Sequence, residues 1–440
     1  MSEWTRRAFV GSAGAAVVAL AGCASSGSSE SNGTTTSGGA ATTARSTETT
    51  ERTTTEETTT SAAASLDAWV THEADASRSG STTESVPVEG ASEQWSYPAE
   101  ALKTFGVAHS PLVSSAGVVV SGGSGVARLS RDGSEQFVKD YEPTGQPFVH
   151  DGTIVLVPEG TGGVLGLDVQ SGSRAFLQRY QDVRSSQISA FPSSEGLVVV
   201  TNPESHVSRL QVLDWGDQSE VWAASSEADT DMKTVTYERP VVSPDGSTLY
   251  TLLEYLDYDD QVNEELTEFV AFDLASGDVR WRKNAVYRPM VATDDQVIVV
   301  AGLSSEPLAS VAASDGSVRW QRSPATESFY WQYPDSRGGV CADGSTVYVA
   351  AGQTVEAVSV SDGSSQWTYS TVNEVESDPV VASNAVGFTD RQGGVVFVST
   401  SGESLAQVNP GDVRPHSLSV AGGRFYLASG AGVHAYGGST

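Results

Sequence analysis

The chain contains, at residues 273–281, the stretch Asp273-Leu-Ala-Ser-Gly277-Asp-Val-Arg-Trp281, in which a polar turn ends in glycine four residues before a tryptophan. The same pattern recurs in Ser314-Asp-Gly316-Ser-Val-Arg-Trp320 and Ser361-Asp-Gly363-Ser-Ser-Gln-Trp367. Weaker copies place Phe137 after Gly133, Phe176 after Gly172, Trp222 six residues after Gly216, and Ala406 after Gly402. A repeat of about 36 to 50 residues that ends in a tight hairpin is typical of stacked four-stranded sheets.

Each repeat begins with a short, mostly apolar strand. Eight such openings occur, at residues 110–113, 146–149, 190–192, 239–242, 288–291, 338–341, 378–381 and 415–418. The second strands, such as Gln296-Val-Ile-Val-Val300, are continuous apolar runs, and such runs belong to strands that are buried on both faces. We therefore predict an all-β fold, an eight-bladed β-propeller of four-stranded antiparallel blades.

The eighth unit ends at Tyr436, before a turn and an outer strand could follow. Residues 93–97 (Glu-Gln-Trp-Ser-Tyr) have the look of the outer strand at Val279-Arg-Trp281. We expect residues 93–97 to complete the last blade, because pairing the two ends closes the ring and covers an open sheet edge. The propeller is expected to span residues 66–440 as a monomer.

The repeats resemble the pyrroloquinoline-quinone-like (PQQ-like) repeat family of eight-bladed propellers, over about residues 69–437. The likeness includes a lead-in, Trp69 with Asp75, Arg78 and Gly80, similar to residues that precede the first blade in many members. The resemblance implies the fold. It leaves the activity open, because the family contains quinone-dependent dehydrogenases as well as non-catalytic scaffolds, such as the lipoprotein subunit of the bacterial outer-membrane barrel-assembly machinery.

Dehydrogenases of this family place a disulfide between adjacent cysteines against the quinone, with calcium and an aspartate base beneath it. The two cysteines here, Cys23 and Cys341, are far apart, and Cys341 is expected to be a small buried apolar residue. The six histidines show no metal-ligand spacing. Residues 254–265 are acidic, but they lack the spaced aspartates of a calcium loop, which favours a solvated hairpin. We expect no enzyme activity, cofactor or metal; the alternative is a dehydrogenase that binds PQQ and calcium.

Arginines recur at or near the openings of the innermost strands, at Arg239, Arg288, Arg337 and Arg414. Loops that lead into these strands converge around the axis of a propeller, so we expect a positive mouth for carboxylates or an acidic partner. Alternatively, each arginine pairs with a carboxylate of a neighbouring blade. Nearby aromatic residues have the composition of an interface or of a channel plug: Tyr237, Tyr287, Tyr330, Trp331 and Tyr333.

Residues 1–22 resemble a twin-arginine export signal with a lipobox. Arg6 and Arg7 precede an apolar run that is too short for a membrane span, and Leu20-Ala-Gly-Cys23 offers Cys23 for lipidation. Residues 23–65 are rich in Ser, Thr, Gly and Glu without an aromatic residue, so we expect a disordered tether. Asn32 stands in a glycosylation acceptor sequence, although a plain spacer is the simpler reading.

The composition is strongly acidic, with 55 acidic against 25 basic side chains and a formal net charge of −30. Such a charge repels nucleic acid and anionic lipid headgroups. Lysine is scarce, which suggests a halophilic protein whose self-repulsion is screened by salt. We predict a non-catalytic scaffold, exported and anchored by lipid to the outer face of the cell membrane, for an unknown protein partner or envelope component. A carbohydrate-binding envelope propeller is the second alternative.

Overall fold

The computed structural model describes residues 74–102, 109–228, 232–257, 261–301, 308–323, 339–411 and 413–438. The chain divides into two units, Met1–Ser61 and Ala62–Thr440, and every described residue belongs to the second. Within the described ranges, no helix is long and apolar enough to cross a membrane. The export, lipidation and glycosylation predictions concern residues outside these ranges and stay predictions: Arg6, Arg7, Cys23 and Asn32.

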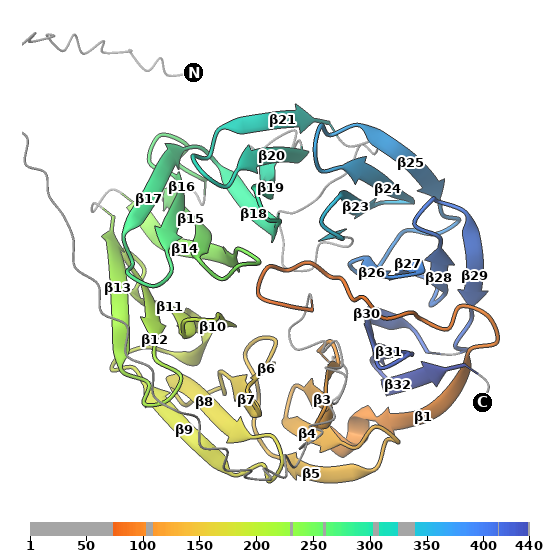
Figure 1. The fold of residues 1–440 in the computed structure, drawn as a ribbon. Helices are drawn as coiled ribbons and strands as arrows, with labels where there is room; N and C mark the ends of the chain where they lie inside the picture. The colour runs from red at the N-terminus through yellow and green to blue at the C-terminus, as the bar shows by residue number, and fades with distance from the viewer. Residues whose placement is uncertain are drawn as a thin grey trace, which may run out of the picture. The chain divides into compact units, whose positions relative to one another are not determined.

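The described strands form eight four-stranded antiparallel sheets, which are the blades of a ring (Figure 1). In blades 1 to 7, the strands follow one another from the axis to the rim in sequence order, as the prediction required. The first four blades contain β2 (Leu112–Ser114), β3 (Gly117–Gly122), β4 (Gly125–Leu129) and β5 (Glu135–Lys139); β6 (Phe148–His150), β7 (Thr153–Leu156), β8 (Gly163–Asp168) and β9 (Arg174–Arg179); β10 (Ile188–Pro192), β11 (Leu197–Glu204), β12 (Val207–Leu213) and β13 (Glu220–Glu227); and β14 (Met232–Val242), β15 (Thr248–Asp257), β16 (Glu268–Asp273) and β17 (Val279–Asn284).

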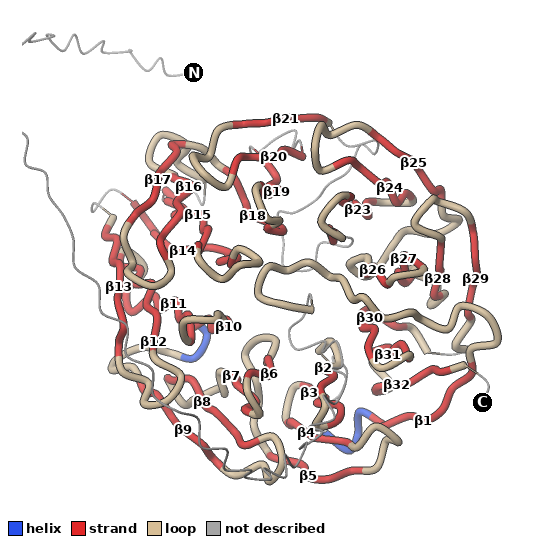
Figure 2. The backbone as a smooth tube through the Cα atoms, in the orientation of Figure 1, coloured by secondary structure: helices blue, strands red, loops and turns tan. Residues whose placement is uncertain are grey.

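The next three blades repeat the same order. They contain β18 (Tyr287–Ala292), β19 (Gln296–Ala301), β20 (Leu308–Ala312) and β21 (Val318–Arg322); β22 (Val340–Ala342), β23 (Thr346–Ala351), β24 (Thr354–Ser359) and β25 (Ser365–Ser370); and β26 (Val380–Ala382), β27 (Ala385–Thr389), β28 (Val395–Val398) and β29 (Ser404–Val408). Two short 3-10 turns, η1 (Ala99–Leu102) and η2 (Ser185–Gln187), lie in connections between blades and are blue in Figure 2.

The eighth blade joins the two ends of the folded chain, which confirms the predicted closure. Its strands are β30 (Pro415–Ala421), β31 (Arg424–Ser429), β32 (Gly432–Gly437) and, at the rim, β1 (Ser92–Pro98). β1 pairs antiparallel with β32, so that Trp95 lies opposite Ala435 and Tyr97 opposite Val433. The open edge of β32 is thereby covered, as ring closure requires.

Burial follows the position of each strand in its blade. All six residues of β3 and of β19 are buried, whereas β17 and β25 alternate between exposed and half-buried residues. The apolar clusters lie mainly between adjacent blades; one of them combines Tyr250 and Phe269 of blade 4 with Val299 and Val311 of blade 5. The core therefore grows blade by blade, as expected for a repeat fold.

Each tryptophan of the repeat joins its blade to the following one. The indole Nε1–H of Trp281 donates to the carbonyl oxygen of Ala313 at 2.9 Å, and the ring packs against Gly316 of blade 5. The same bond joins Trp95 to Arg131 (2.9 Å), Trp222 to Leu274 (2.6 Å), Trp320 to Val360 (2.7 Å) and Trp367 to Thr400 (2.8 Å). The glycine and the tryptophan of one sequence repeat thus belong to two different junctions between blades.

The turn before Trp222 differs from the sequence-based interpretation. The sequence pattern places the glycine of this turn at Gly216, six residues before Trp222. In the structure, the residue with the left-handed backbone is Gln218, with φ of 58°. Its N–H donates to the carbonyl of Asp214 at 3.0 Å, as that of Gly277 does to Asp273 in the next blade. The equivalent position is therefore Gln218, and the spacing to Trp222 is four residues, as in the other copies.

Candidate functional site

The segment that precedes β1 crosses the inner strands of five blades and is orange in Figure 1. We call residues 75–86 the strap. Its carbonyls accept bonds from the backbone N–H groups of Val242 (3.0 Å), Ala292 (3.0 Å), Ala342 (2.7 Å) and Val381 (2.9 Å), in blades 4 to 7. In blade 8, the N–H of Gly423 donates to the Glu84 side chain at 3.0 Å. The strap therefore ties these blades together where their innermost strands end.

A carboxylate-centred turn starts the strap. The oxygens of Asp75 accept hydrogen bonds from the hydroxyl of Ser77 (2.7 Å), the hydroxyl of Ser79 (2.6 Å) and the N–H of Ser79 (3.1 Å). Arg78 projects from this turn, with φ of 57°, and its guanidinium carbon lies 5.9 Å from the centre of the Phe191 ring. The turn therefore directs one cation at the innermost strand of blade 3.

Gly80 shows why the strap needs a glycine. Its φ is +60°, and a Cβ at this position would lie 2.6 Å from Cβ of Cys341. Cys341 lies in β22 and is fully buried, as predicted for a small apolar residue. Two of the lead-in residues of the family resemblance, Asp75 and Gly80, thus hold the strap, while Arg78 faces a cavity.

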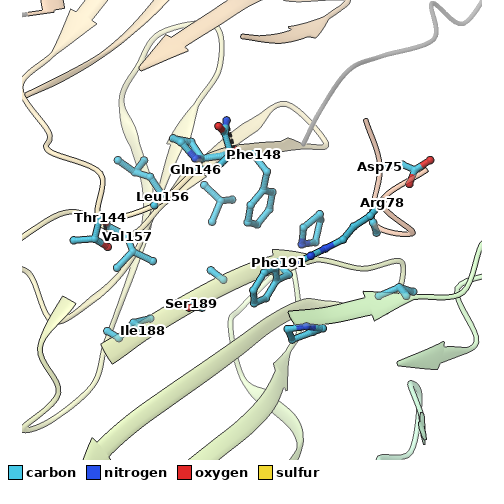
Figure 3. Close-up of a pocket in the computed structure, with 18 of the residues that line it drawn as sticks. Asp75, Arg78, Thr144, Gln146, Phe148, Leu156, Val157, Ile188, Ser189 and Phe191 are labelled. Carbon is cyan, nitrogen blue, oxygen red and sulfur yellow. Dashed lines mark hydrogen bonds between the residues drawn. The ribbon is translucent and has the colours of Figure 1, made fainter. Parts of the chain in front are cut away.

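The cavity has a volume of about 330 Å³ and is lined by the strap and by blades 2 to 4. Figure 3 shows Asp75 and Arg78 at one side of the cavity and Thr144 and Ile188 at the other. Figure 3 shows Arg78 reaching toward Phe191, with Phe148 beside them. The described walls are mostly apolar, and their two charged groups, Asp75 and Arg78, are on the strap, so the cavity combines an apolar wall with one end that carries both charges.

The innermost strand of blade 3 is unusual among the described innermost strands. Ser189 in β10 is exposed, and the next three residues are only half-buried. In contrast, β2, β22 and β26 are buried throughout. The inner wall of blade 3 is therefore open to the cavity, and this opening places Ser189 among the residues that line it.

The predicted positive mouth contains acidic partners. Arg288 Nη2 lies 2.9 Å from Glu254 Oε1, and both side chains are mostly buried. Glu254 belongs to β15 of the preceding blade, so Arg288 makes the neighbouring-blade pair given above as the alternative. Arg239 sits at a bulge of β14, with φ of 48°, and its Nη1 is 3.8 Å from the sulfur of Met290.

Glu238 adds a second carboxylate beside these arginines. Burial raises the pKa of the Glu238 carboxyl, the Glu254 carboxylate raises it further, and Arg239 and Arg288 oppose both effects. Two cations and two carboxylates thus meet here. The charges of these four described groups balance when both carboxyl groups are ionised, and binding of an acidic partner by these arginines stays a prediction.

The aromatic residues beside the arginines take part in packing. The ring of Tyr237 is buried and lies edge-on to Phe272, with centroids 6.3 Å apart, and burial raises the pKa of Tyr237 to about 12. Tyr287 is half-buried and lies edge-on to Phe269, with ring centroids 6.1 Å apart.

Among the remaining candidates, Arg414 is exposed in the segment before β30. The other candidates lie outside the described residues: Arg337, Tyr330, Trp331 and Tyr333.

The acidic segment 254–265 is described except for residues 258–260. Glu254 of this segment pairs with Arg288, as described above, and two further side chains cap backbone groups within the segment. Asp257 Oδ1 accepts from the N–H of Gln261 at 2.9 Å, and Asn263 Oδ1 accepts from the N–H of Glu265 at 3.1 Å. Across the described part of the chain, no three His, Cys, Asp or Glu side chains group closely enough to hold a metal ion.

Comparisons with known proteins agree on the fold. A family model described as outer membrane protein assembly factor BamB matches residues 304–437, which is less than half of the chain. No curated protein matches the chain.

Among solved structures, BamB from Moraxella catarrhalis is 16% identical, with a TM-score of 0.54, and the match covers 79% of this chain and 97% of that one. A europium-containing methanol dehydrogenase is 12% identical, with a TM-score of 0.56, covering 82% and 89%. Quinohemoprotein alcohol dehydrogenase from Comamonas testosteroni is 12% identical, with a TM-score of 0.59, covering 85% and 81%. At these identities the likeness shows an eight-bladed propeller similar to both kinds of protein.

Sequence reasoning missed the cavity and the path of the strap. The sequence contains no local signal for the cavity, because the residues equivalent to Ser189 in other blades are also polar, for example Gln146 in blade 2 and Asp378 in blade 7. The meeting of Arg78 with Phe191 has no local signal, because more than a hundred residues separate them in the sequence.

Proposed function

We propose that the chain is a non-enzymatic scaffold, exported and lipid-anchored, that presents the loops of its propeller to a protein partner or envelope component on the outer face of the cell membrane. The observation that carries this proposal is the strap. Its carbonyls accept main-chain bonds from the innermost strands of blades 4 to 7, so it runs along these strands. The side chains of Asp75 and Ser79 hydrogen-bond to each other within the strap.

The comparisons support an assembly role over part of the chain. The matching family model is described as an assembly factor, and residues 304–437 include blades 6 and 7 and most of blade 8. A propeller suits this role because each blade contributes loops to a common face, which gives a wide surface without a catalytic centre.

The alternative, a PQQ-dependent dehydrogenase, finds less support in the residues. Cys341 has no adjacent cysteine and is buried against Gly80. Asp75, the one carboxylate among the described residues that line the cavity, accepts bonds from Ser77 and Ser79. The described residues also offer no group of three metal-binding side chains. They therefore do not fit the quinone with its calcium ion.

A titration with PQQ and calcium tests the non-enzymatic part of the proposal. The purified full-length protein is expected to show no saturable absorbance change and no dye-linked alcohol oxidation. Stoichiometric quinone binding accompanied by turnover would overturn the scaffold proposal.

Crosslinking on intact cells tests partner binding. A photo-crosslinking residue at Arg414, in an exposed connection between blades, is expected to capture a defined protein or envelope polymer. The matched control is the same residue at Arg174, which is exposed on the rim strand β9. Identical products at both positions, or none at Arg414, would count against the proposal. Cys23→Ser is expected to release the protein into the medium, and retention on the membrane would contradict lipid anchoring.

A further inference from the structure

We infer that the cavity between the strap and blades 2 to 4 is a binding site for a small aromatic monocarboxylate, with the carboxylate on Arg78 and the ring against Phe191. This site is separate from the proposed scaffold role, which concerns the loops, and does not depend on it. The cavity volume of about 330 Å³ lies at the small end of the range of small-molecule sites, which is about 300 to 1,000 Å³. A ligand with one ring fits this size.

The walls determine the apolar part of the ligand. Phe148 and Phe191 come from adjacent blades, and Pro240 and Val242 come from a third. Phe148 is held edge-on to Trp215, with centroids 6.3 Å apart, so this wall is fixed before a ligand enters. Aromatic and proline surfaces favour a flat apolar group, because rings gain by offset or edge-to-face contact beyond the area they bury.

Arg78 determines the charged part. A guanidinium has five N–H donors in a planar fork, and this fork matches the two oxygens of a carboxylate. Its position above the Phe191 ring, 5.9 Å from the centroid, brings the cation next to the apolar wall. A ligand that carries its carboxylate close to its ring can therefore use both contacts at once.

Asp75 limits the ligand to one negative charge. It lines the same cavity, and its oxygens are held in the strap turn by Ser77 and Ser79. A second carboxylate on the ligand would meet this fixed negative charge, and the described residues that line the cavity include no lysine, histidine or second arginine. At the opposite end, Thr144 donates its hydroxyl to the carbonyl of Val157 at 3.1 Å, so that end is polar but neutral.

Binding of phenylacetate and phenylacetamide to the full-length protein tests the inference. The two probes have the same shape and differ in charge. Calorimetric titration is expected to show one site that prefers phenylacetate by at least about ten-fold, which corresponds to about 1.4 kcal/mol. Equal affinity for the two probes, or no saturable binding of phenylacetate, would overturn the inference.

Two variants locate the site. Arg78→Gln is expected to bring the preference for phenylacetate down to about one-fold while phenylacetamide binds as before. Ser189→Phe fills the open wall of blade 3 and is expected to abolish binding of both probes. Arg179→Gln, on the rim strand β9, is the matched control and is expected to change neither. A preference that persists in Arg78→Gln, or binding that persists in Ser189→Phe, excludes this cavity as the site.

A third variant distinguishes a structural role of Arg78 in the strap from a direct role in binding the carboxylate. If Arg78→Gln loses both probes and melts at a lower temperature, the strap has loosened. Arg78→Lys then decides the matter, because it keeps the cation. Recovery of the preference for phenylacetate supports the inference, and failure to recover it overturns the inference.

The same chemistry occurs at the end of a peptide whose last residue is aromatic. A second arm therefore compares the tripeptide Gly-Gly-Phe with its C-terminal amide, in the wild type and in Arg78→Gln. If only the tripeptide shows an acid preference that depends on Arg78, the ligand is a peptide end. If only phenylacetate shows such a preference, the ligand is a free small acid. No acid preference in either arm overturns the inference.

Discussion

Replacing Gly277 by alanine tests how the blades are joined. Gly277 has φ of +77°, and a Cβ there would lie 2.6 Å from Cδ2 of Trp222, whose side chain is 8% exposed. A left-handed alanine costs about 1 to 2 kcal/mol, and forcing a buried ring to move costs about 1 to 3 kcal/mol. We therefore expect Gly277→Ala to lower the free energy of unfolding by about 2 to 5 kcal/mol.

Gly411 provides a matched control. Its φ is +76°, nearly that of Gly277, but no atom lies within 4 Å of the site of its Cβ. Gly411→Ala is therefore expected to cost only the conformational part, about 1 to 2 kcal/mol. A second control removes the ring: in a Trp222→Leu background, the effect of Gly277→Ala should fall toward that of Gly411→Ala, because the two residues are in contact.

Urea unfolding at one fixed salt concentration measures these differences through the transition midpoints, provided that the slopes agree. The reasoning is refuted if Gly277→Ala costs no more than Gly411→Ala. It is also refuted if the penalty of Gly277→Ala is undiminished in the Trp222→Leu background.

Three further predictions concern the junctions, the closure and a buried carboxyl group. Trp320→Phe removes the donor that reaches the carbonyl of Val360 at 2.7 Å, so we expect a loss of about 1 to 3 kcal/mol in urea unfolding; unchanged stability would contradict the bond's role. Deletion of residues 1–98 removes β1 together with the strap and exposes the edge of β32. Aggregation or self-association should then appear in size-exclusion chromatography, and a folded monomer would argue against closure by β1. Burial, reinforced by Glu254, raises the pKa of Glu238 above its unfolded value, so its contribution to stability is lost as the pH rises through the folded pKa. Glu238→Gln should therefore melt higher than wild type at about pH 7 but equally below about pH 4; an equal difference at both pH values would speak against this.

The eight blades could be predicted because their signals are local. Alternation in a rim strand such as β17 and a continuous apolar run such as β19 depend on residues that are neighbours in the sequence. The closure by Trp95 and Tyr97 could also be predicted, because the last repeat lacked one strand and only a segment with the same pattern could complete it. The sequence pattern showed the glycine of each turn. It did not show that the glycine packs against the ring of the preceding blade, as Gly277 does against Trp222.

Features of the candidate site depended on contacts that no local pattern encodes. The turn at Gln218 escaped notice because a left-handed backbone is unusual for that residue type. The arginine repeat predicted one common mouth, yet Arg288 meets Glu254 because two side chains from adjacent blades come within 2.9 Å. The composition, the strands and the ring were therefore determined by the sequence itself. The path of the strap, the cavity at Arg78 and the balance of charges were decided only by tertiary structure, since they depend on distances of a few ångströms between residues far apart in the chain.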